Sequence, residues 1–508
     1  MFLGMATPSA LLPDHVDVFI IGAGFAGLGM AIKLREAGRD DFVAVDRGDD
    51  VGGTWRDNTY PGAACDVPSQ LYSFSFELNP RWSRSFSPQA EIQDYLRDVA
   101  DRSGVLDRFH FGVNFEAGVW DEEAQHWRVR TSAGECTASV LVSAAGALSD
   151  PKMPDIDGID SFEGEVFHSA QWNHDSDLTG KRVAVIGTGA SAVQIVPEIV
   201  DQVARLDVYQ RTAPWVMPRR DRAYTRVERF AFRHVPGIQK LYRAGIYWGR
   251  ETFVPAFTIN PKIATPAKKM SLANIQRGIK DPKLREKVTP HFEIGCKRIL
   301  ISNDWYPSLD RDDVELVTEA ITKVTPRGIV TVDGTEREVD VLVNATGFHT
   351  TDLPIGERIT GAHGGTLAQQ WEREGVSAYK GTMTRGFPNL FFIVGPNTGL
   401  GHTSMVYMIE SQIVYAIDAL ATMRAKGIGA LEPKRSAQDR WNADIQRRMR
   451  RTVWQTGGCS SWYLDEHGRN VTLWPRTTFK FRDLTSRFDP EQYDATARSR
   501  DQRVEQHA

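Results

Sequence analysis

Two stretches of this sequence share one order of features: a short apolar strand, a glycine-rich turn, a helical stretch and a second strand. The first runs from Val16 to Asp46 and contains G-A-G-F-A-G, and the second starts at Arg182 and contains G-T-G-A-S-A. This order is typical of a βαβ unit, in which a pyrophosphate lies on the helix N-terminus. The pattern predicts an α/β fold with two Rossmann-like dinucleotide-binding domains, or with one working domain and one decayed copy.

The first turn has the three glycines that a dinucleotide-binding turn requires, Gly22, Gly24 and Gly27. The first permits the tight turn, the second lets the backbone approach a pyrophosphate, and the third lets the helix pack closely on the strand. Asp46 ends the second strand, where a carboxylate can accept hydrogen bonds from ribose hydroxyls. The alternative is a glycine-rich turn in an unrelated sheet, but strand, helix and acid in register favour dinucleotide binding.

The second turn indicates a different nucleotide. Its predicted contacts come from one short segment: Gly187, Thr188, Gly189, Ser191 and Ala192. After the following strand, Arg211 and Thr212 stand where an acid would otherwise be expected. A carboxylate would repel a 2′-phosphate, whereas a guanidinium and a hydroxyl can bind one. The pattern predicts NADPH rather than NADH; the alternative is that Arg211 is an ordinary surface side chain.

Composition excludes several other classes of protein. The 508-residue chain is 41% apolar and 25% charged with a net charge of -4, which is typical of a globular protein of two or three domains and gives no reason to expect nucleic acid as a partner. No apolar run is long enough to span a bilayer, and no metal site is predicted. The four cysteines, Cys65, Cys136, Cys296 and Cys459, form no C-x-x-C pair. We therefore expect no disulfide scaffold, no redox-active dithiol and a reducing, cytoplasmic compartment.

The spacing of these features predicts how the chain is divided. Two pairs of segments are expected to form the nucleotide domains: residues 1–150 and 351–508 the first, and residues 151–217 and 321–350 the second. A helical insert is expected over 218–320, where strand patterns stop. From Arg226 to Trp248 basic and aromatic residues alternate, which is more typical of a core face with a solvated basic side than of a helix on a membrane surface.

Short segments at the ends and between the domains have their own patterns. The residues up to Asp17 lack the basic start and long apolar run of a signal peptide and are expected to form a short lead-in. The polar residues from Asp489 to Ala508 are expected to be disordered. Ala-Ala-Gly at 144–146 and Ala-Thr-Gly at 345–347 each end an apolar strand, and we expect the chain to cross between the nucleotide domains there.

Two further motifs make the pattern specific. Residues Gly52 to Asp66 read GGTWRDNTYPGAACD, and residues Phe162 to Trp172 read FEGEVFHSAQW. Placed after the first and before the second nucleotide unit, they resemble the two fingerprints of type I Baeyer–Villiger monooxygenases, which are class B flavoprotein monooxygenases. The resemblance covers nearly the whole chain. Asn173 stands where that family usually has proline or aspartate, so a flavin-containing heteroatom hydroxylase is the nearest alternative.

The resemblance implies FAD on the first unit, with Thr54 and Trp55 among its contacts, and NADPH on the second. It also implies that Arg298 is the catalytic arginine and that Asp66 is the acid beside it. A guanidinium suits this role because it keeps its charge when buried and can stabilise a peroxide and then an oxyanion. A lysine could lose its proton there.

Three further assignments follow from the resemblance. Lys297 is expected to contact NADP, and Trp462 to close over the nicotinamide. The second fingerprint is carried by four residues: Phe162, Gly164, His168 and Trp172. The resemblance implies that His168 couples domain movement, and the alternative is that it is a structural histidine.

A third FAD contact is predicted near the C-terminal end of the chain. An apolar strand, a Gly/Asn turn and a long helix follow one another after residue 390. The N-terminus of such a helix can stabilise negative charge on a reduced flavin. Asn397, Thr398 and His402 are therefore candidate neighbours of the isoalloxazine ring, and the alternative is an ordinary strand-to-helix crossover.

Together these features predict an FAD- and NADPH-dependent monooxygenase that inserts one atom of O2 into ketones to give esters or lactones through a C4a-peroxyflavin, and that also oxidises thioethers. The alternatives are a heteroatom (N/S) hydroxylase and a non-catalytic flavoprotein. A pyridine-nucleotide disulfide reductase is disfavoured because the vicinal dithiol is missing.

Overall fold

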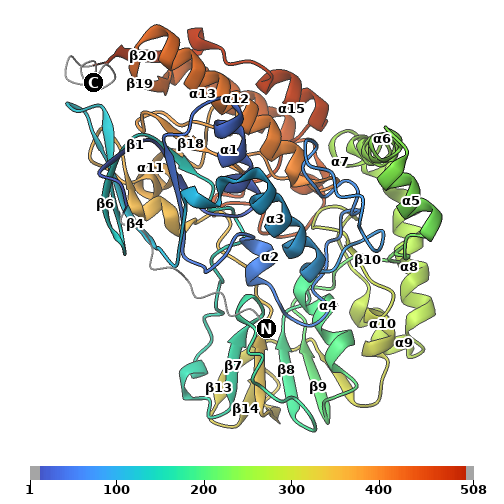
Figure 1. The fold of residues 1–508 in the computed structure, drawn as a ribbon. Coiled ribbons are helices and arrows are strands. Elements are labelled where there is room, and N and C mark those ends of the chain that lie inside the picture. The colour runs from blue at the N-terminus through green and yellow to red at the C-terminus, as the bar shows by residue number, and fades with distance from the viewer. Residues whose placement is uncertain (1–11, 499–508) are drawn as a thin grey trace, which may run out of the picture.

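The computed structural model describes residues 12–498 and has two large sheets, of eight and five strands, with helices beside them (Figure 1). The larger sheet has the strand order β17-β4-β5-β6-β1-β2-β3, with β18 also paired to β6. Its strands are β1 (His15–Ile21), β2 (Phe42–Asp46), β3 (Phe109–Phe111), β4 (Phe115–Asp121), β5 (His126–Thr131), β6 (Gly134–Ser143), β17 (Ile359–Thr360) and β18 (Leu390–Phe392). β6, β1, β2 and β3 pair in parallel, which is the arrangement predicted for the first nucleotide unit.

The smaller sheet is parallel throughout, in the order β12-β9-β8-β16-β7. Its strands are β7 (Glu165–His168), β8 (Arg182–Ile186), β9 (Arg205–Tyr209), β12 (Val314–Val317) and β16 (Val341–Asn344). An antiparallel meander precedes β16 in the chain: β13 (Ile321–Thr325), β14 (Gly328–Thr331) and β15 (Glu336–Glu338). The predicted fold class, with two dinucleotide-binding units, is therefore present.

The remaining helices lie outside the insert. They are α1 (Phe25–Glu36), α2 (Thr54–Asp57), α3 (Gln89–Ser103), α4 (Ala190–Ile199), α10 (Trp305–Leu309), α11 (Leu367–Glu374), α12 (Met405–Lys426), α13 (Arg435–Met449), α14 (Val453–Thr456) and α15 (Thr478–Thr485). α1 is buried on nearly all sides because it lies between the large sheet and the long helix α12. α4 contains Pro197, as its sequence indicated.

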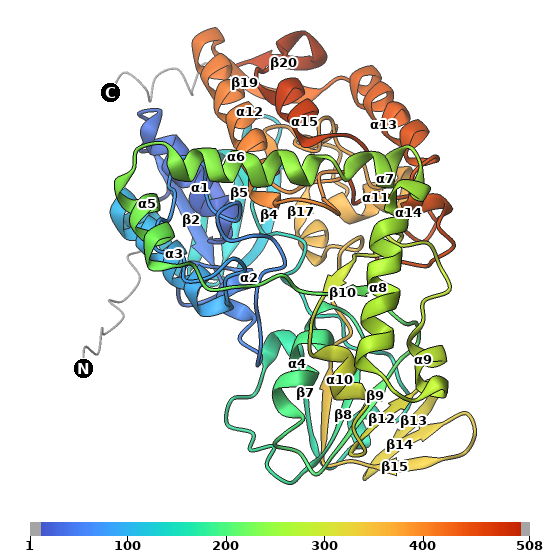
Figure 2. The same ribbon diagram turned by 90° about the vertical axis from the view of Figure 1, so that its right-hand side faces the viewer.

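The insert is helical, as predicted, and lies along one side of the molecule (Figure 2). It consists of α5 (Arg226–His234), α6 (Ile238–Glu251), α7 (Val254–Thr258), α8 (Thr265–Gly278) and α9 (Pro282–Val288). Its two ends are held together by the parallel pair β10 (Val216–Met217) and β11 (Leu300–Ile301). The end expected at residue 320 is too late, because β12 pairs with β9 in the smaller sheet. None of the helices in residues 12–498 is long and apolar enough to cross a bilayer.

The two predicted crossings lie side by side. Pro151 pairs with Phe348 as an isolated bridge, and the amide of Lys152 donates to the carbonyl of Gly347 at 2.9 Å. Each crossing also packs against the glycine-rich turn of its own domain, through the carbonyl oxygens of Ala144 and Ala345. The connection between the nucleotide domains is therefore in direct contact with both turns.

The expectation of disorder from Asp489 onward is wrong for residues 489–498. β20 (Tyr493–Ala497) pairs with β19 (Ile428–Pro433), and Tyr493 is buried. The Asp489 carboxylate accepts hydrogen bonds from the hydroxyl of Tyr379 at 2.6 Å and from the hydroxyl of Tyr415. Polar composition predicted disorder here, but these distant tyrosines anchor the segment. The lead-in up to residue 11 and the end from residue 499 lie outside the described residues.

Candidate active site

The three glycines of the first turn differ in what requires them. Gly22 has a φ of +107°, and a Cβ there would lie 2.6 Å from the carbonyl oxygen of Ala144. A Cβ on Gly27 would overlap the carbonyl oxygen of Gly22. At Gly24 the nearest atom would be the Cα of Gly53 at 3.7 Å, an ordinary contact. The fold requires Gly22 and Gly27, whereas the space beside Gly24 fits the close approach of a pyrophosphate.

The surroundings of this turn also suit a phosphate. α1 has neither a side-chain cap nor an acid in its first turn, so its N–H groups and partial positive charge are available to an anion. Asp46 accepts hydrogen bonds from the backbone of Ala23 at 2.7 Å and of Gly48 at 2.8 Å, and it pairs with Arg56 at 2.6 Å. The carboxylate therefore fixes the shape of the turn, and its bond to ribose hydroxyls stays a prediction.

In the second turn, too, the packing of the protein requires one glycine and leaves open space beside another. Gly187 has a φ of +117°, and a Cβ there would lie 2.5 Å from the carbonyl oxygen of Ala345. A Cβ on Gly189 would meet no protein atom within 4 Å. Ala192 is fully buried, as the third position of the motif requires, and α4 also begins without a side-chain cap or an acid. The protein's own packing requires glycine at position 187. At position 189 it does not, so the space there fits a bound ligand.

This difference gives a prediction for two neighbouring substitutions. Gly189→Ala is expected to leave the melting temperature within about 1 °C of the parent and to raise KM for NADPH about tenfold or more, because the new methyl group would enter only the nucleotide's space. Gly187→Ala is expected to lower the melting temperature by several degrees through strain and overlap. Thermal melting and steady-state kinetics of both variants measure this. A stability loss in Gly189→Ala with unchanged KM would contradict it.

Two cations lie together beside the second turn. Arg211 is exposed just after β9, and Thr212 is held to the turn because the Thr188 hydroxyl donates to its carbonyl at 3.1 Å. Burial and the charge of Arg211 lower the pKa of Lys297 below its ordinary value. Neither cation forms an ion pair with a carboxylate in residues 12–498. Adjacent cations without an acid are suited to an anion such as a 2′-phosphate.

The first fingerprint runs from one nucleotide turn to the other. A Cβ on Gly53 would lie 3.1 Å from the Cα of Gly24, so the start of the fingerprint touches the first turn. The Tyr60 hydroxyl donates to Gln194 on α4 at 2.9 Å, and the Gln194 amide donates back to the fingerprint backbone at 2.9 Å. The fingerprint ends at Asp66. One continuous segment therefore joins both nucleotide units to the predicted catalytic acid.

Thr54 and Trp55 begin α2 beside the first turn. The Trp55 indole donates to the Tyr72 hydroxyl at 3.0 Å, and the Thr54 carbonyl accepts from the Asn58 amide at 3.0 Å. These bonds leave the Thr54 hydroxyl as the polar group that can reach a cofactor. Their contact with FAD stays a prediction.

Arg298 and Asp66 form an ion pair with two hydrogen bonds. The guanidinium donates from Nε to Oδ2 and from Nη2 to Oδ1, each at 2.6 Å, and Nη1 lies 3.5 Å from the carbonyl oxygen of Leu400. Asp66 raises the pKa of Arg298 above its ordinary value, despite burial. Burial would raise the pKa of Asp66, but the charge and hydrogen bonds of Arg298 outweigh it and the pKa is lowered. Both side chains stay charged, and 31% of the Arg298 side chain remains open to solvent.

The structure adds two residues that sequence reasoning missed. Arg250 of α6 lies near the pair, where its charge lowers the pKa of Asp66 and burial lowers its own pKa. Tyr463 is buried beside Arg298, and burial raises its pKa to about 12, so it stays a neutral hydroxyl at physiological pH. Tyr463 directly follows Trp462 and could have been noticed for that reason. Nothing in the sequence distinguishes Arg250 from the other arginines of the insert.

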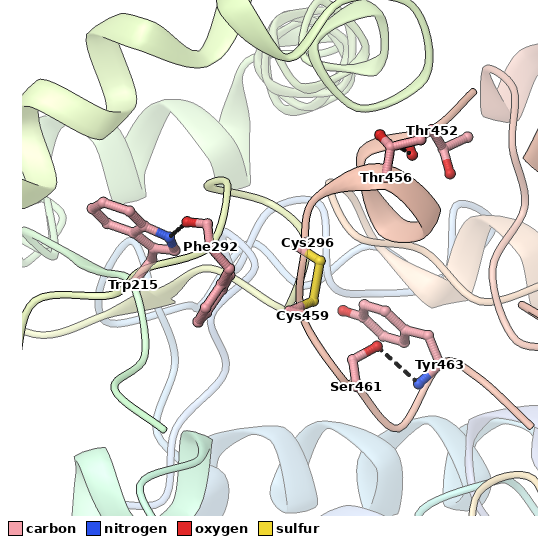
Figure 3. The surroundings of a disulfide bond; sticks show 8 residues. All are labelled: Trp215, Phe292, Cys296, Thr452, Thr456, Cys459, Ser461 and Tyr463. Atoms are coloured by element: carbon pink, nitrogen blue, oxygen red, sulfur yellow. Dashed lines mark hydrogen bonds between the residues drawn. A yellow bond between two sulfur atoms is a disulfide. The ribbon is translucent and has the colours of Figure 1, made fainter. Parts of the chain in front are cut away.

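A disulfide joins two loops of the candidate site (Figure 3). Cys296 and Cys459 are bonded although they are 163 residues apart, a single disulfide that the expectation of no disulfide scaffold did not foresee. Cys65 and Cys136 are free and buried. Cys296 directly precedes Lys297, and Cys459 stands three residues before Trp462, whose side chain is 45% exposed. The bond therefore ties the loop of the predicted catalytic arginine to the loop of the predicted nicotinamide cover.

Breaking this bond is expected to loosen the loop around Trp462. In the chain-entropy treatment a loop of this length corresponds to a stabilisation of at most about 5 kcal/mol. Cys459→Ser should therefore lower the melting temperature by several degrees and raise KM for NADPH. Dithiothreitol should have the same effects on the parent and none on Cys459→Ser. The control is Cys136→Ala, which removes a free buried thiol and should keep its sensitivity to reductant. Identical melting of parent and Cys459→Ser would contradict the expectation.

The predicted isoalloxazine neighbours lie at the turn between β18 and α12. The Asn397 amide donates to the carbonyls of Asn470 at 2.9 Å and Leu473 at 3.1 Å, and the Thr398 hydroxyl donates within its own turn. His402 is buried with Nε2 3.1 Å from the carboxylate of Glu251 on α6. Their side chains hold this turn and α6 in place. Contact with the flavin stays a prediction for all three.

The second fingerprint supports the join between the domains. A Cβ on Gly164 would lie 2.6 Å from the ring of Phe162, and Trp172 packs edge-on against Phe167. His168 ends β7 opposite Asn344 of β16, and its Nδ1 accepts from the Ala170 amide at 3.1 Å. Burial lowers its pKa, so the ring is neutral. His168 lies beside the crossing at residues 345–347. This position suits either of the two predicted roles, coupling of domain movement or support of the structure.

The molecule has two nucleotide units, and one fingerprint segment joins them and ends at a guanidinium–carboxylate pair. This arrangement defines an oxidoreductase of the two-dinucleotide class. Residues 19–228 match the family described as pyridine nucleotide-disulphide oxidoreductase. A Streptomyces coelicolor protein named Baeyer-Villiger monooxygenase is 52% identical over 482 residues, 94% of this chain and 92% of that protein. A Pseudomonas aeruginosa protein of the same name is 50% identical over 498 residues, 97% and 94% of the two chains. The chain belongs to the Baeyer–Villiger monooxygenase family, as the fingerprints indicated.

Solved structures share the whole fold. Cyclohexanone monooxygenase from Rhodococcus sp. Phi1 bound to NADP+ superposes with a TM-score of 0.85 at 29% identity, over 96% of this chain and 100% of that one. The OTEMO complex with FAD and NADP gives 0.84 at 28% identity, over 95% and 99%. The predicted fold class and family are confirmed: the chain is a monooxygenase of the Baeyer–Villiger family.

Proposed function

We propose that this protein inserts one oxygen atom of O2 into ketones to give esters or lactones. The observation that carries the proposal is the Arg298–Asp66 pair, which ends the fingerprint that joins the two nucleotide turns. A cyclohexanone monooxygenase structure described as bound to epsilon-caprolactone, a lactone, has a TM-score of 0.82 at 27% identity. That relative supports a lactone as the kind of product expected here.

The residues of this chain suit the charges of such a reaction. FAD bound at the first turn, once reduced by NADPH bound at the second, would supply the oxygen-activating chemistry. In the overall balance NADPH supplies two electrons, one oxygen atom enters the C–C bond beside the carbonyl, and the other leaves as water. Arg298 stays protonated and can stabilise the negative charge that develops on the carbonyl oxygen. Asp66 stays ionised and orients the guanidinium, so it donates no proton.

The cofactor contacts belong to this proposal as well. For FAD they are Gly22, Gly24, Gly27, Asp46, Thr54, Trp55, Asp66, Asn397, Thr398 and His402. For NADPH they are Gly187, Thr188, Gly189, Ser191, Ala192, Arg211, Thr212, Lys297 and Trp462. Thioethers are proposed as further substrates, because a reagent that delivers one oxygen atom to a carbonyl carbon can also oxidise sulfur. A cytoplasmic location stays a prediction. It was inferred from the spacing of the cysteines, and the disulfide weakens that inference.

Rapid mixing tests the proposal directly. The purified protein is reduced with NADPH without air and then mixed with O2, with or without a panel of ketones and thioethers. We expect a lasting oxygenated-flavin absorbance that decays faster with a ketone, and an ester or lactone among the products. Immediate reoxidation with hydrogen peroxide as the product, whatever is added, would overturn the proposal. Oxidation of thioethers but of no ketone would favour the heteroatom hydroxylase.

A further inference from the structure

Helix α6 of the insert turns several polar side chains inward, beside apolar residues that pack against the core. The Arg243 guanidinium donates to the carbonyls of Gln70 at 2.8 Å and Leu71 at 3.0 Å. Glu251 is buried and bonded to His402 and to the Thr478 hydroxyl. A helix on a protein surface normally turns such side chains to solvent. The sequence favoured a core face with a solvated basic side for this stretch. Tyr242 and Ile246 do pack against the core and Lys240 is exposed, but α6 also buries polar side chains and exposes large apolar ones.

The outward side of α6 carries large apolar residues beside one exposed cation, Lys240. Leu241 is 69% exposed and Trp248 is 56% exposed, with Gly245 exposed between them. Trp248 contacts Phe479 of α15, whose ring is also exposed. α6 runs along the outside of the molecule in both views, so no other part of the described chain covers this side (Figures 1 and 2).

The neighbouring segments of the insert also expose large apolar side chains. Half of the sixteen large hydrophobic side chains that are exposed among the described residues lie between 227 and 263, so they are concentrated in one segment of the chain. We call this group, with Phe479, the apolar face: Val227, Phe230, Val235, Leu241, Trp248, Phe253, Ile259, Ile263 and Phe479.

Positive charge accompanies the apolar face. Between residues 226 and 269 the exposed charged side chains are all basic: Arg226, Arg229, Arg233, Lys240, Lys262 and Lys269. Two acids occur in this range. Glu251 is buried, and Glu228 caps α5 and pairs with Arg222 at 2.6 Å. The whole chain has a net charge of -4, so this basic excess is local.

We propose that the apolar face docks on the surface of an anionic lipid bilayer. Helices that lie in the headgroup region of a bilayer typically expose leucine, phenylalanine and tryptophan between lysines and arginines. Tryptophan in particular favours that region. The six cations would meet anionic headgroups. A symmetric dimer through the same face would instead place these cations against their own copies, which disfavours a second chain as the occupant. The inference is independent of the proposed function.

Vesicle sedimentation tests this with the full-length FAD-bound protein. We expect co-sedimentation with vesicles of phosphatidylcholine and phosphatidylglycerol, weak binding to phosphatidylcholine alone, and release as salt rises. Leu241→Asp should lower the partition coefficient about tenfold or more, because an exposed apolar anchor becomes an anion. Arg229→Gln combined with Arg233→Gln should lower binding to the anionic vesicles only.

The matched control is Val332→Asp, since Val332 is 67% exposed in the turn between β14 and β15 and outside the apolar face. It should bind vesicles like the parent. Trp248→Ala, which only shortens an exposed side chain, repeats the test if Leu241→Asp melts below the parent. Equal binding by parent, Leu241→Asp and Trp248→Ala would overturn the proposal, as would failure to bind anionic vesicles. So would a parent dimer that Leu241→Asp converts to a monomer, because the face would then join two copies of the chain.

Discussion

Arg298→Ala is expected to lower the rate of ester formation by a factor of at least about 10² to 10³, while NADPH is still oxidised and hydrogen peroxide becomes the main product. The factor is that of losing a donor aimed at a developing oxyanion. Loss of Arg298 would also leave Asp66 as an unpaired carboxylate in the site. Product analysis and peroxide assays at matched NADPH consumption measure the effect.

Two companion variants separate charge, geometry and stability. Arg298→Lys keeps a positive charge but cannot make both bonds to Asp66, so ester formation should fall nearly as far. Arg182→Ala is the matched control, because Arg182 also binds a carboxylate with two nitrogens, that of Asp340, at the start of β8 and away from both turns. It should keep full ester formation per flavin. Ketone oxidation at the parental rate in Arg298→Ala would refute the assignment of the catalytic arginine.

Arg211→Ala is expected to raise KM for NADPH about 10- to 100-fold and to leave KM for NADH nearly unchanged. The magnitude follows from losing hydrogen bonds between charged partners. Lys297→Ala should act in the same direction, because Lys297 lies near Arg211 and both lack a carboxylate partner in residues 12–498. Steady-state kinetics with both nucleotides provide the measurement.

The double variant tests whether the two cations bind one phosphate. If they do, the loss in Arg211→Ala/Lys297→Ala should differ from the sum of the single losses, since groups with a shared partner are coupled. Lys323→Ala removes an exposed cation from the meander of the same domain and should change neither KM. Equal increases in KM for NADPH and NADH in Arg211→Ala would mean that the 2′-phosphate lies elsewhere.

Local patterns carried most of the predictions that were confirmed. The strand-turn-helix order before Asp46 and after Arg182 produces β1, α1 and β2, and then β8, α4 and β9. These units could be predicted because the glycine positions and the apolar runs act within about thirty residues of chain. The two fingerprints identified the family for the same reason, since each is a continuous segment.

The errors concern contacts between residues far apart in the chain. Four cysteines allow several pairings, and only the fold brings Cys296 to Cys459. Residues 493–497 are polar, but they pair with β19 because Tyr493 is buried beside Tyr415. The end of the insert was placed too late because a four-residue strand, Val314–Val317, has no pattern that tells which sheet it joins.

The sequence by itself determined that the chain has two dinucleotide units, which nucleotide suits each, and which arginine and acid to examine, because these depend on residue types at fixed short spacings. The tertiary structure alone decided that Asp66 and Arg298, 232 residues apart, bind each other, and that Arg250 and Tyr463 lie beside them. It also decided which side of α6 is turned outward, because a helical pattern shows two faces but not which one the rest of the protein covers.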